Sequence, residues 1–313
     1  MRPRILIVGQ EAAGAQILRA VAGSAHEVVA VLTQEPATRG GPASLKALAK
    51  QAEVPVFPAR LVKDPAFAER VRDWKVDVLL NVHSLHIVAD AVLAAPRIGS
   101  FNLHPGPLPE YAGLNTVGWA IYKDEAEYGV TVHWMQPGID TGPIAFEQRF
   151  AVQANATALS LAAECTRRGV PLLLELLARA EDGAAGIPSR PQDLSARVYY
   201  ARGRVPQDGR VDWNRPGAEI ARFARAFDYG PFASPWGWPT TLLGDRTVGV
   251  LGLKTTGRVT DCPPGGHRFE NGSLQFAASD QWIEVSRVLL DGVPVRPETL
   301  SQSVAVLSHE GAA

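Results

Sequence analysis

Three apolar runs near the beginning of the chain, separated by helix-length segments, constrain its fold more than any other feature. The runs cover residues 4–9, 27–33 and 76–82, and each predicts a strand. The first and third are almost continuously apolar, which is typical of a parallel strand buried on both faces. Helices are predicted at residues 13–22, 45–51 and 65–74, with a short strand at 54–57. Strands that alternate with helices at this spacing predict an α/β fold with a doubly wound, mainly parallel sheet.

The glycines that follow the first strand do not form a dinucleotide-binding motif. Gly9 and Gly14 are present, but the middle glycine of the Gly-x-Gly-x-x-Gly fingerprint is missing. The sequence therefore predicts the sheet of a nucleotide-binding fold without its pyrophosphate site. Ligands of such sheets bind beyond the carboxyl ends of the strands, so polar residues that follow these ends are the candidates for a site.

A short strand predicted at residues 100–104 carries two polar residues and ends at Pro105. Because side chains alternate along a strand, Asn102 and His104 point to the same face. Two further prolines follow within four residues, and a proline cannot donate a hydrogen bond to a neighbouring strand. We therefore expect a stiff loop directly after this polar pair.

A single acid lies in the next glycine-rich loop. We predict a helix at 116–123 and a strand at 130–135, after which residues 136–142 form a Gly/Pro-rich loop that contains Asp140. An amide and an imidazole at one strand end, with a carboxylate on a neighbouring loop, suit a reaction through a tetrahedral oxyanion. The amide and the imidazole would donate to the oxyanion, and the carboxylate would accept or relay protons. Alone, each of these residues would more often be a cap or a turn residue, so the prediction depends on all three.

Three separated blocks of this region, in the same order, closely resemble the formyltransferases that use 10-formyltetrahydrofolate. The blocks are Asn102-Leu103-His104-Pro105, then Leu108-Pro109 with Tyr111-x-Gly113, and Gly138-Ile139-Asp140-Thr141-Gly142. The family includes methionyl-tRNA formyltransferase, glycinamide ribonucleotide formyltransferase, and the N-formyltransferases of amino sugars and of peptide natural products. The resemblance implies a folate-dependent one-carbon transferase in which Asn102, His104 and Asp140 are the catalytic residues.

The resemblance also implies where the two substrates bind. The pterin ring of the folate would lie against the loop of Leu85, His86, Ile87 and Val88, and the folate would also contact Asp140 and the loop of Gly106, Pro107, Leu108 and Pro109. Tyr111 and Asn115 would face the acceptor. Two loop sequences depart from the commoner family pattern, since Gly106-Pro107 replaces Ser-Leu and Leu114-Asn115-Thr116 replaces Ala-Ala-Pro.

We expect Asp140 to orient His104, or to relay the proton of the acceptor amine through water. A nearby carboxylate raises the pKa of a histidine above its ordinary value of about 6.5, so this arrangement predicts a His104 that is partly protonated near neutral pH. The sequence shows no pattern of a nucleophilic Ser or Cys beside these residues, and no metal-ligand spacing.

The second part of the chain predicts a smaller domain. We place the catalytic domain at residues 1–190 and the second domain at 191–313, with a polar linker at 181–193 between them. The block that precedes a predicted helix at 216–227 resembles the segment joining the two domains in sugar-amine and natural-product formyltransferases. Short strands separated by Asp-Gly and Asn-Gly turns follow between residues 240 and 295. With the family resemblance, they indicate a small, OB-like β-barrel.

Composition and charge narrow the class of partner. The chain has 313 residues, a net charge of −1 and an isoelectric point near 6.7, so no overall positive field attracts nucleic acid. Its two cysteines are far apart and form no metal-ligand pattern, which favours a reduced, cytoplasmic protein. No signal peptide and no long apolar span is recognisable, which argues against secretion and against membrane insertion.

The acceptor is predicted to be a small amine rather than a tRNA. Phosphate contacts need clustered Lys and Arg, whereas the loop at 36–44 contains only Arg39, and Ala112 stands where many relatives carry Arg. We expect an amino sugar, an amino acid such as hydroxyornithine, or an aminoacyl group on a carrier protein, as in natural-product biosynthesis. Three alternatives stay open: a methionyl-tRNA formyltransferase, a 10-formyltetrahydrofolate hydrolase of the same fold, and a non-catalytic folate-binding module.

Overall fold

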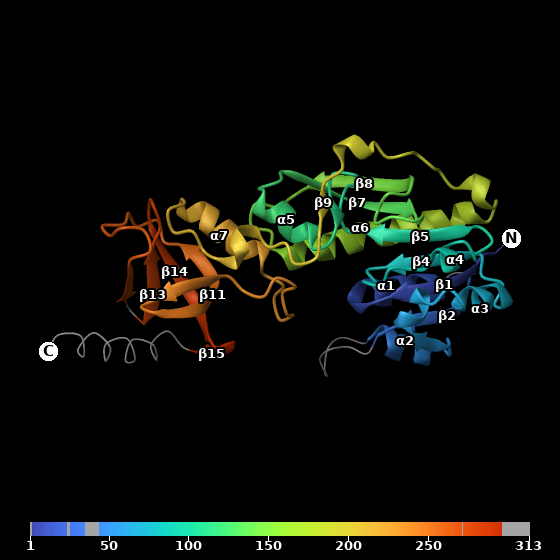
Figure 1. The fold of residues 1–313 in the computed structure, drawn as a ribbon, viewed down its shortest axis with the longest axis horizontal. Coiled ribbons are helices and arrows are strands. Elements are labelled where there is room, and N and C mark those ends of the chain that lie inside the picture. Colours follow the sequence, from blue (N-terminus) through green and yellow to red (C-terminus); the bar gives the residue numbers. More distant parts are fainter. Residues whose placement is uncertain (1, 24–25, 35–43, 271, 296–313) are drawn as a thin grey trace. The chain divides into compact units, whose positions relative to one another are not determined.

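The computed structural model describes residues 2–23, 26–34, 44–270 and 272–295, and the backbone contacts divide the chain into two compact units (Figure 1). Unit 1 comprises Met1–Thr116, Glu127–Ala151 and Ala162–Tyr200, and unit 2 comprises Val117–Ala126, Val152–Leu161 and Ala201–Ala313. Each unit therefore combines segments that are separate in the sequence. The proposed domain limits, 1–190 and 191–313, stay a prediction.

Among the described residues, unit 1 is built on a seven-stranded sheet with the strand order β3-β2-β1-β4-β5-β7-β8. The strands are β1 (Arg4–Gly9), β2 (Glu27–Thr33), β3 (Val56–Pro58), β4 (Val78–Val82), β5 (Gly99–His104), β7 (Glu127–Trp134) and β8 (Ile144–Ala151). Neighbouring strands from β3 to β5 pair in parallel, whereas β7 and β8 pair antiparallel at one edge. The predicted α/β fold with a mainly parallel sheet is confirmed.

The strand order reverses between β1 and β4, with β2 on one side of this pair and β5 on the other. In open α/β sheets, ligands bind beyond the carboxyl ends of the strands at such a reversal. Gly9 at the end of β1 is paired with Val82 at the end of β4. The segments that begin with Gln10 and His83 therefore leave the sheet side by side at the place where a ligand is expected.

Helices connect the parallel strands of unit 1 (Figure 1). They are α1 (Glu11–Ala22), α2 (Leu45–Gln51), the 3₁₀ helix η1 (Ala59–Lys63), α3 (Phe67–Asp73) and α4 (Asp90–Leu93), and the long α6 (Ala158–Ala180) follows β8. The start of α2 is fixed by Ser44, whose Oγ accepts a hydrogen bond from the Ala47 N–H at 3.2 Å. Such a cap satisfies one of the free N–H groups at a helix start, which is why the helix begins there.

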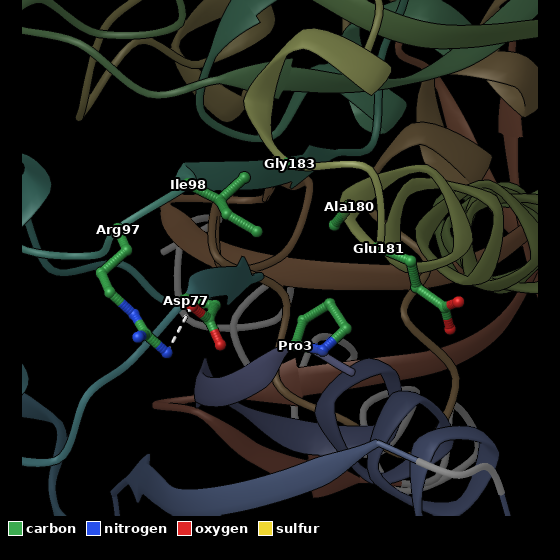
Figure 2. A pocket seen from close by; sticks show the side chains of 7 residues that line it. All are labelled: Pro3, Asp77, Arg97, Ile98, Ala180, Glu181 and Gly183. Carbon is green, nitrogen blue, oxygen red and sulfur yellow. Dashed lines mark ion pairs between the residues drawn. The ribbon is translucent and has the colours of Figure 1, made fainter. Parts of the chain in front are cut away.

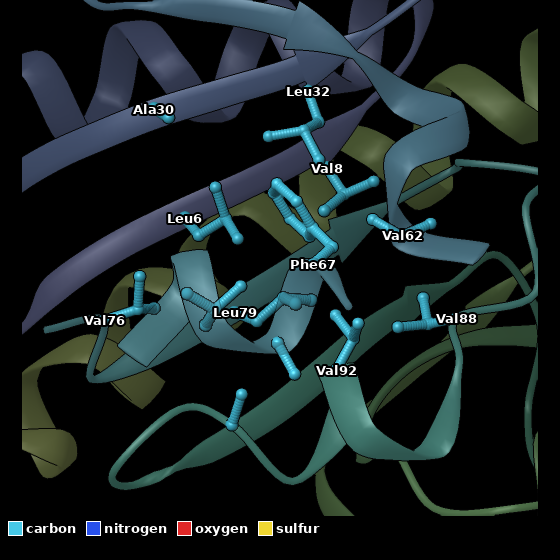
Figure 3. Close-up of a cluster of buried hydrophobic side chains, with 13 residues drawn as sticks. Leu6, Val8, Ala30, Leu32, Val62, Phe67, Val76, Leu79, Val88 and Val92 are labelled. Atoms are coloured by element: carbon cyan, nitrogen blue, oxygen red, sulfur yellow. The ribbon is translucent and has the colours of Figure 1, made fainter. Parts of the chain in front are cut away.

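The apolar run of β1 is buried on both of its faces. Leu6 and Val8 pack with Phe67 of α3 in a cluster that also includes side chains of β2, β4 and α4 (Figure 3). Ile5 and Ile7 point to the other face and are also fully buried. Burial on both faces explains why the sequence of this strand is continuously apolar, as expected for a central parallel strand.

Close packing explains the two glycines around the β1–α1 turn. A Cβ built on Gly14 would lie 2.8 Å from Leu45 Cδ2 and 3.4 Å from the Gly9 backbone. A Cβ on Gly9 would lie 3.3 Å from the Gly14 Cα. The glycines let the first turn of α1 approach the end of β1, which is a packing role and requires no phosphate.

Unit 2 contains an antiparallel half-barrel, the smaller β domain that the sequence predicts. In its described residues, six strands have the order β10-β11-β14-β13-β12, and β15 pairs with β14. Their bounds are β10 (Thr240–Leu243), β11 (Arg246–Thr255), β12 (His267–Glu270), β13 (Ser273–Ala277), β14 (Trp282–Leu290) and β15 (Val293–Val295). Helix α7 (Gly217–Ala226) places Ile220 in a buried cluster with Phe276 and Ile283 of the sheet. Helix α5 (Thr116–Tyr122) contributes most of its residues to this unit.

In the ranges that the structure describes, no helix has both the length and the apolar character needed to cross a membrane.

Both cysteines are free thiols. Cys165 is buried, and burial raises the pKa of its thiol far above the ordinary value. A buried thiol of this kind is a core residue rather than a nucleophile.

Candidate active site

Three neighbouring strands of unit 1 place a row of polar side chains across the sheet. Asn81 of β4 is paired with Asn102 of β5, and Asn102 is paired with His133 of β7. The Asn81 Nδ2 donates to Asn102 Oδ1 at 2.8 Å, and Asn102 Nδ2 and His133 Nε2 are 3.1 Å apart. All three side chains are buried. Paired residues of adjacent strands point to the same face, so the row lies on one side of the sheet, near the carboxyl ends of β4 and β5.

For a neutral His133 ring, a backbone carbonyl sets the direction of the hydrogen bonds in this row. His133 Nδ1 lies 2.8 Å from the Trp134 carbonyl, which can only accept, so Nδ1 carries the proton. In the neutral ring, Nε2 is then an acceptor, and the Asn102 NH2 group must donate to it. The Asn102 oxygen therefore faces Asn81, whose NH2 group donates. One hydrogen of the Asn102 NH2 group serves His133, which leaves the other for a ligand.

His104, at the end of β5, is held by the loop that follows it. Its Nε2 donates to the Tyr111 carbonyl at 2.5 Å. A Cβ on Gly106 would lie 3.0 Å from this nitrogen and 3.1 Å from the Tyr111 carbonyl oxygen, so a glycine leaves the contact undisturbed. The neutral ring that donates from Nε2 has an unprotonated Nδ1.

The proline-rich loop after His104 is held in place by hydrogen bonds to its carbonyl groups. Pro105 has no N–H, but its carbonyl accepts from the hydroxyls of Thr116 and Tyr128, each at 3.0 Å. The Gly106 carbonyl accepts from Thr131 Oγ1 at 2.8 Å, and that oxygen also accepts from the Leu108 N–H at 3.2 Å. Side chains of β7 and α5 thus fix the loop at the positions where its prolines cannot donate.

Asp140 approaches both histidines from the loop between β7 and β8. Its Oδ2 accepts from the Gly113 N–H at 2.8 Å and lies 3.6 Å from His104 Nδ1. Its Oδ1 lies 3.5 Å from His133 Nε2. Asp140 has φ = 55°, a left-handed conformation that Asp adopts more readily than most residues. The structure therefore brings together the amide, the imidazole and the carboxylate that were selected from the sequence.

Asp140 and His104 have altered pKa values. Burial by itself would raise the pKa of Asp140, but His104, His133 and the Gly113 N–H together hold it well below its ordinary range, so the carboxylate is ionised at neutral pH. For His104, burial lowers the pKa and outweighs the opposite effects of Asp140 and the Tyr111 carbonyl. Asp140 raises the pKa of His104 as expected, but the prediction of a partly protonated ring near neutral pH is wrong, because removing water from the ring is the larger effect.

The residues expected to hold the pterin ring differ in how exposed their side chains are. Leu85 and Ile87 are 60% and 72% exposed, which is unusual for large apolar side chains. Val88 is buried in the core cluster of Figure 3, so only its backbone is available to a ligand. His86 contacts Gln34 through Nε2 at 2.5 Å. At the start of this loop, the Nε2 of His83 is buried and has no hydrogen-bond partner among the described residues.

The other predicted contact residues are mostly buried. Gly106, Pro107 and Leu108 are buried and Pro109 is partly exposed. The ring of Tyr111 is 6% exposed, because it stacks on Tyr200 at 5.4 Å and meets Tyr128 edge-on at 5.1 Å. Asn115 is partly exposed and has φ = 57°. Of the two residues expected to face the acceptor, Asn115 thus has the more accessible side chain.

Asn81 and His133 belong to the hydrogen-bonded network but were not selected from the sequence. Asn81 is the only polar residue of β4, and His133 is a polar residue between the apolar Val132 and Trp134 of β7. A buried polar side chain is nearly always hydrogen-bonded, so such an interruption signals a partner on the next strand. The sequence contained this signal, but the pairing register that identifies the partner comes from the sheet.

The pocket in Figure 2 lies elsewhere in unit 1. Its lining includes Pro3, Asp77 and Ile98, which come directly before β1, β4 and β5, so it is at the amino ends of these strands. Asp77 is buried and accepts from the Arg4 N–H at 2.8 Å, and Arg97 pairs with it at 2.7 Å. These contacts satisfy the carboxylate and give it a structural role.

Among the described residues, no group of three or more His, Cys, Asp and Glu is arranged to hold a metal ion.

Two family models match this chain. The model described as formyl transferase matches residues 1–177, and the model described as formyl transferase, C-terminal domain, matches residues 205–302. Among curated proteins, the methionyl-tRNA formyltransferases of Chlorobium luteolum and of Pseudomonas putida strain GB-1 are each 31% identical to this chain. Each of these alignments covers 92% of this chain and 92% of the relative.

Two solved structures have a similar fold at low sequence identity. The N-formyltransferase from Helicobacter canadensis, in complex with folinic acid and dTDP-3-aminofucose, has a TM-score of 0.69 at 18% identity and covers 90% of this chain and 98% of its own. The sugar 3N-formyltransferase WlaRD, solved in the presence of dTDP and 5-N-formyl-THF, has a TM-score of 0.67 at 16% identity and covers 91% and 97%. At these identities the likeness concerns the fold alone.

Proposed function

This chain belongs to the formyltransferase family, and we propose that it formylates the amine of a small molecule or of a carrier-bound aminoacyl group. It is an enzyme of a family that uses 10-formyltetrahydrofolate as the formyl donor. The observation that carries the proposal is the network in which Asn102, His104 and Asp140 converge at the end of β5.

Asn102 would stabilise the negative charge that develops during the transfer. The bound folate supplies a formyl carbonyl that an amine can attack. As the amine attacks, the oxygen of this carbonyl gains charge, and a fixed N–H donor lowers the barrier at that moment. The hydrogen of the Asn102 NH2 group that His133 does not use is such a donor, held at a defined place by the row of hydrogen bonds.

His104 and Asp140 would take up the proton of the attacking amine. The Nε2–H of His104 is engaged by the Tyr111 carbonyl, so its use as a second donor to the oxyanion would require that contact to open. Nδ1 is unprotonated in this tautomer and lies 3.6 Å from the Asp140 carboxylate. Once Nδ1 accepts a proton, the imidazolium has an acceptor at each nitrogen. This arrangement favours the proton-accepting role for the pair. The proton would then pass to the folate nitrogen as its bond to the formyl carbon breaks.

The loop of residues 83–88 has features that suit a pterin ring. Leu85 and Ile87 offer exposed apolar surface, and pockets for flat ligands are lined mainly by such side chains with a few polar groups. The unpartnered Nε2 of His83 is a polar group of this kind. Because burial and the nearby His104 lower the pKa of His83 to about 4, its ring is neutral at pH 7.

Local structure and charge support a small acceptor over a tRNA. The net charge is −1, and Ala112 is fully buried where β6 (Ala112–Gly113) pairs with β9 (Tyr199–Tyr200). This buried position leaves no space for a phosphate-binding arginine. The loop at 36–44, in which Arg39 is the only basic residue, lies almost entirely outside the described residues. Methionyl-tRNA remains the second candidate because the relatives at 31% identity are tRNA enzymes.

The experiment incubates the protein with 10-formyltetrahydrofolate and a panel of acceptors, including nucleotide-linked amino sugars, hydroxyornithine, aminoacyl carrier proteins and methionyl-tRNA. Mass spectrometry then detects the acceptor that gains a formyl group. Formylation of one of the small or carrier-bound amines is expected. Formylation of methionyl-tRNA alone would contradict the proposal, and formate release without an amine would identify a hydrolase.

The same assay tests the three site residues. Asn102→Ala is expected to reduce kcat by about 10²–10³, as loss of one fixed donor does in other enzymes. His104→Ala and Asp140→Ala remove the proton acceptor or its partner and are each expected to reduce kcat by about 10²–10⁴. All three proteins are expected to stay folded. Circular dichroism and the thermal midpoint provide the folding control. A His104→Ala variant with nearly normal turnover would remove the basis of the assignment, and donor binding without turnover by the unaltered protein would favour a binding module.

A further inference from the structure

Asn81 makes one hydrogen bond and leaves its other polar atom unused. The side chain is 6% exposed. Its Nδ2 donates to Asn102 Oδ1 at 2.8 Å, whereas its Oδ1 is buried and has no partner among the described residues. The network in unit 1 therefore ends at an amide that is only half satisfied.

Stability alone does not account for an asparagine at this position. Leu79, two residues earlier on the same face of β4, belongs to the apolar cluster of Figure 3, and Val8 is the residue of β1 that is paired with Asn81. A leucine in place of Asn81 would extend that cluster. Asn81 leaves its own Oδ1 without a partner, and a leucine would instead leave Asn102 Oδ1 without one, so the cost of one unsatisfied acceptor is similar in both cases. The additional apolar contacts would then make the leucine at least as stable.

The hydrogen bond from Asn81 fixes the orientation of the Asn102 amide. A terminal amide has two orientations that exchange its oxygen and its NH2 group. His133 receives the NH2 group at one end, and Asn81 donates to the oxygen at the other. A reversed Asn102 would place its oxygen against the unprotonated Nε2 of His133 and its NH2 group against the NH2 group of Asn81. Both contacts would be repulsive, so the two partners together allow one orientation.

We propose that Asn81 is a positioning residue for formyl transfer, holding the Asn102 amide so that its free N–H points to the reacting oxygen. This inference depends on the proposed function, because it assigns a role in the same reaction. Asn81 acts through Asn102 and has no contact with the formyl group. Its effect is therefore expected in kcat and not in the KM of the folate.

The first test replaces Asn81 by a residue of similar size. Asn81→Leu removes the donor and fills the same space, so the protein is expected to fold, with a thermal midpoint equal to or above that of the unaltered enzyme. With the acceptor identified above, kcat is expected to fall about tenfold, the loss that corresponds to one hydrogen bond, while the KM of the folate stays within about twofold. The matched control is Ser100→Ala. Ser100 lies on β5 two residues before Asn102, and its Oγ donates to the Leu93 carbonyl at 2.8 Å, away from the site.

The second test uses Asn81→Asp, which has the same shape. Burial raises the pKa of a carboxyl group, and only the protonated form can donate to Asn102 Oδ1. The kcat of this variant relative to the unaltered enzyme is therefore expected to rise as the pH falls, whereas the ratio for Asn81→Leu stays constant. A purely structural role would not produce this difference between two folded variants.

The outcomes separate the positioning role from the function itself. A tenfold loss in Asn81→Leu with normal kcat in Ser100→Ala supports the proposal. Normal kcat in a folded Asn81→Leu, or an Asn81→Asp ratio that does not change with pH, overturns it and leaves the formyltransferase activity standing. Failure of the unaltered enzyme to formylate any amine overturns the proposed function instead, and that result is visible before any variant is made.

Discussion

At the scale of single residues, His104 shows how burial and charge compete. Both ring nitrogens face groups of the protein, Nε2 the Tyr111 carbonyl and Nδ1 the Asp140 carboxylate. Both partners favour the protonated ring, yet burial lowers the pKa by more than they raise it. The imidazole is therefore mainly neutral at pH 7, which is the form that can accept a proton from an amine.

This balance predicts the pH dependence of turnover. If neutral His104 accepts the proton, kcat is constant near neutral pH and falls on the acid side, with a midpoint below 6.5 because the pKa is lowered. In Asp140→Asn, which keeps the shape but loses the charge, the midpoint moves to a lower pH. Measurement of kcat at saturating donor and acceptor between pH 4.5 and about 8.5 checks both statements. A kcat that increases as the pH falls from 8 to 6 would instead favour the imidazolium as the active form.

The residues that a sequence reveals are those that stand out from their local pattern. Asn102, His104 and Asp140 were found because they lie at strand ends and loops and match family blocks. Asn81 and His133 were missed because their roles arise from the strand register across β4, β5 and β7. The lowered pKa of His104 was also missed, since the extent of burial follows from the folded loop and not from the neighbouring residues in the chain.

At the scale of elements, residues 188–200 form a strap that fastens the loop of Asp140. Gln192 Nε2 donates to the carbonyls of Asp140 and Gly142, at 2.9 Å and 2.6 Å. Arg197 donates to the Ile139 carbonyl at 2.9 Å. From the sequence, the first part of this segment was interpreted as a polar linker between domains. Its contacts are directed to backbone carbonyls, which leave no pattern in the sequence of the loop that receives them.

The strap predicts an effect of a residue that lies outside the reacting groups. Gln192→Ala removes two hydrogen bonds to the Asp140 loop, each with a net stabilisation of about 1 kcal/mol. We expect faster amide hydrogen exchange in residues 138–142 and a kcat lowered about tenfold. Arg190→Ala is the control from the same segment, because Arg190 forms an exposed ion pair with Glu147, and such pairs have little effect. Unchanged exchange in Gln192→Ala would show that the strap does not hold the loop.

At the scale of the whole molecule, the apolar pattern predicted the sheets and their covering helices. It did not predict which distant segments join the same unit. Each unit has its own buried cluster, and most of their strands were expected from their residues, whereas the edge strand β8 was not predicted. The segments 117–126 and 152–161 belong to unit 2 although they lie among the elements of unit 1 in the sequence. No local pattern indicates such an exchange, since it depends on which buried surface each segment meets after folding.

Unfolding is a property of the whole molecule, and His83 gives it a pH dependence of known sign. Its pKa is lowered from 6.5 to about 4 by burial and by the nearby His104. Between these values the unfolded chain binds a proton that the folded chain does not, so stability decreases as the pH falls from about 6.5 towards 4. From pH 7.5 to 5, this single group is expected to lower the free energy of unfolding by about 1–2 kcal/mol.

His83→Asn isolates that contribution. His83 has φ = 57°, and asparagine is among the residues that tolerate this conformation, so the variant keeps the backbone and loses the titrating group. Urea unfolding of both proteins at pH 7.5 and at pH 5 gives the comparison. The loss of stability between the two pH values is expected to be about 1–2 kcal/mol smaller in the variant, because the variant lacks the titrating ring of His83. Equal losses in the two proteins would mean that His83 is accessible to protons in the folded state, and its ring would then not be the buried neutral group that borders the proposed folate site.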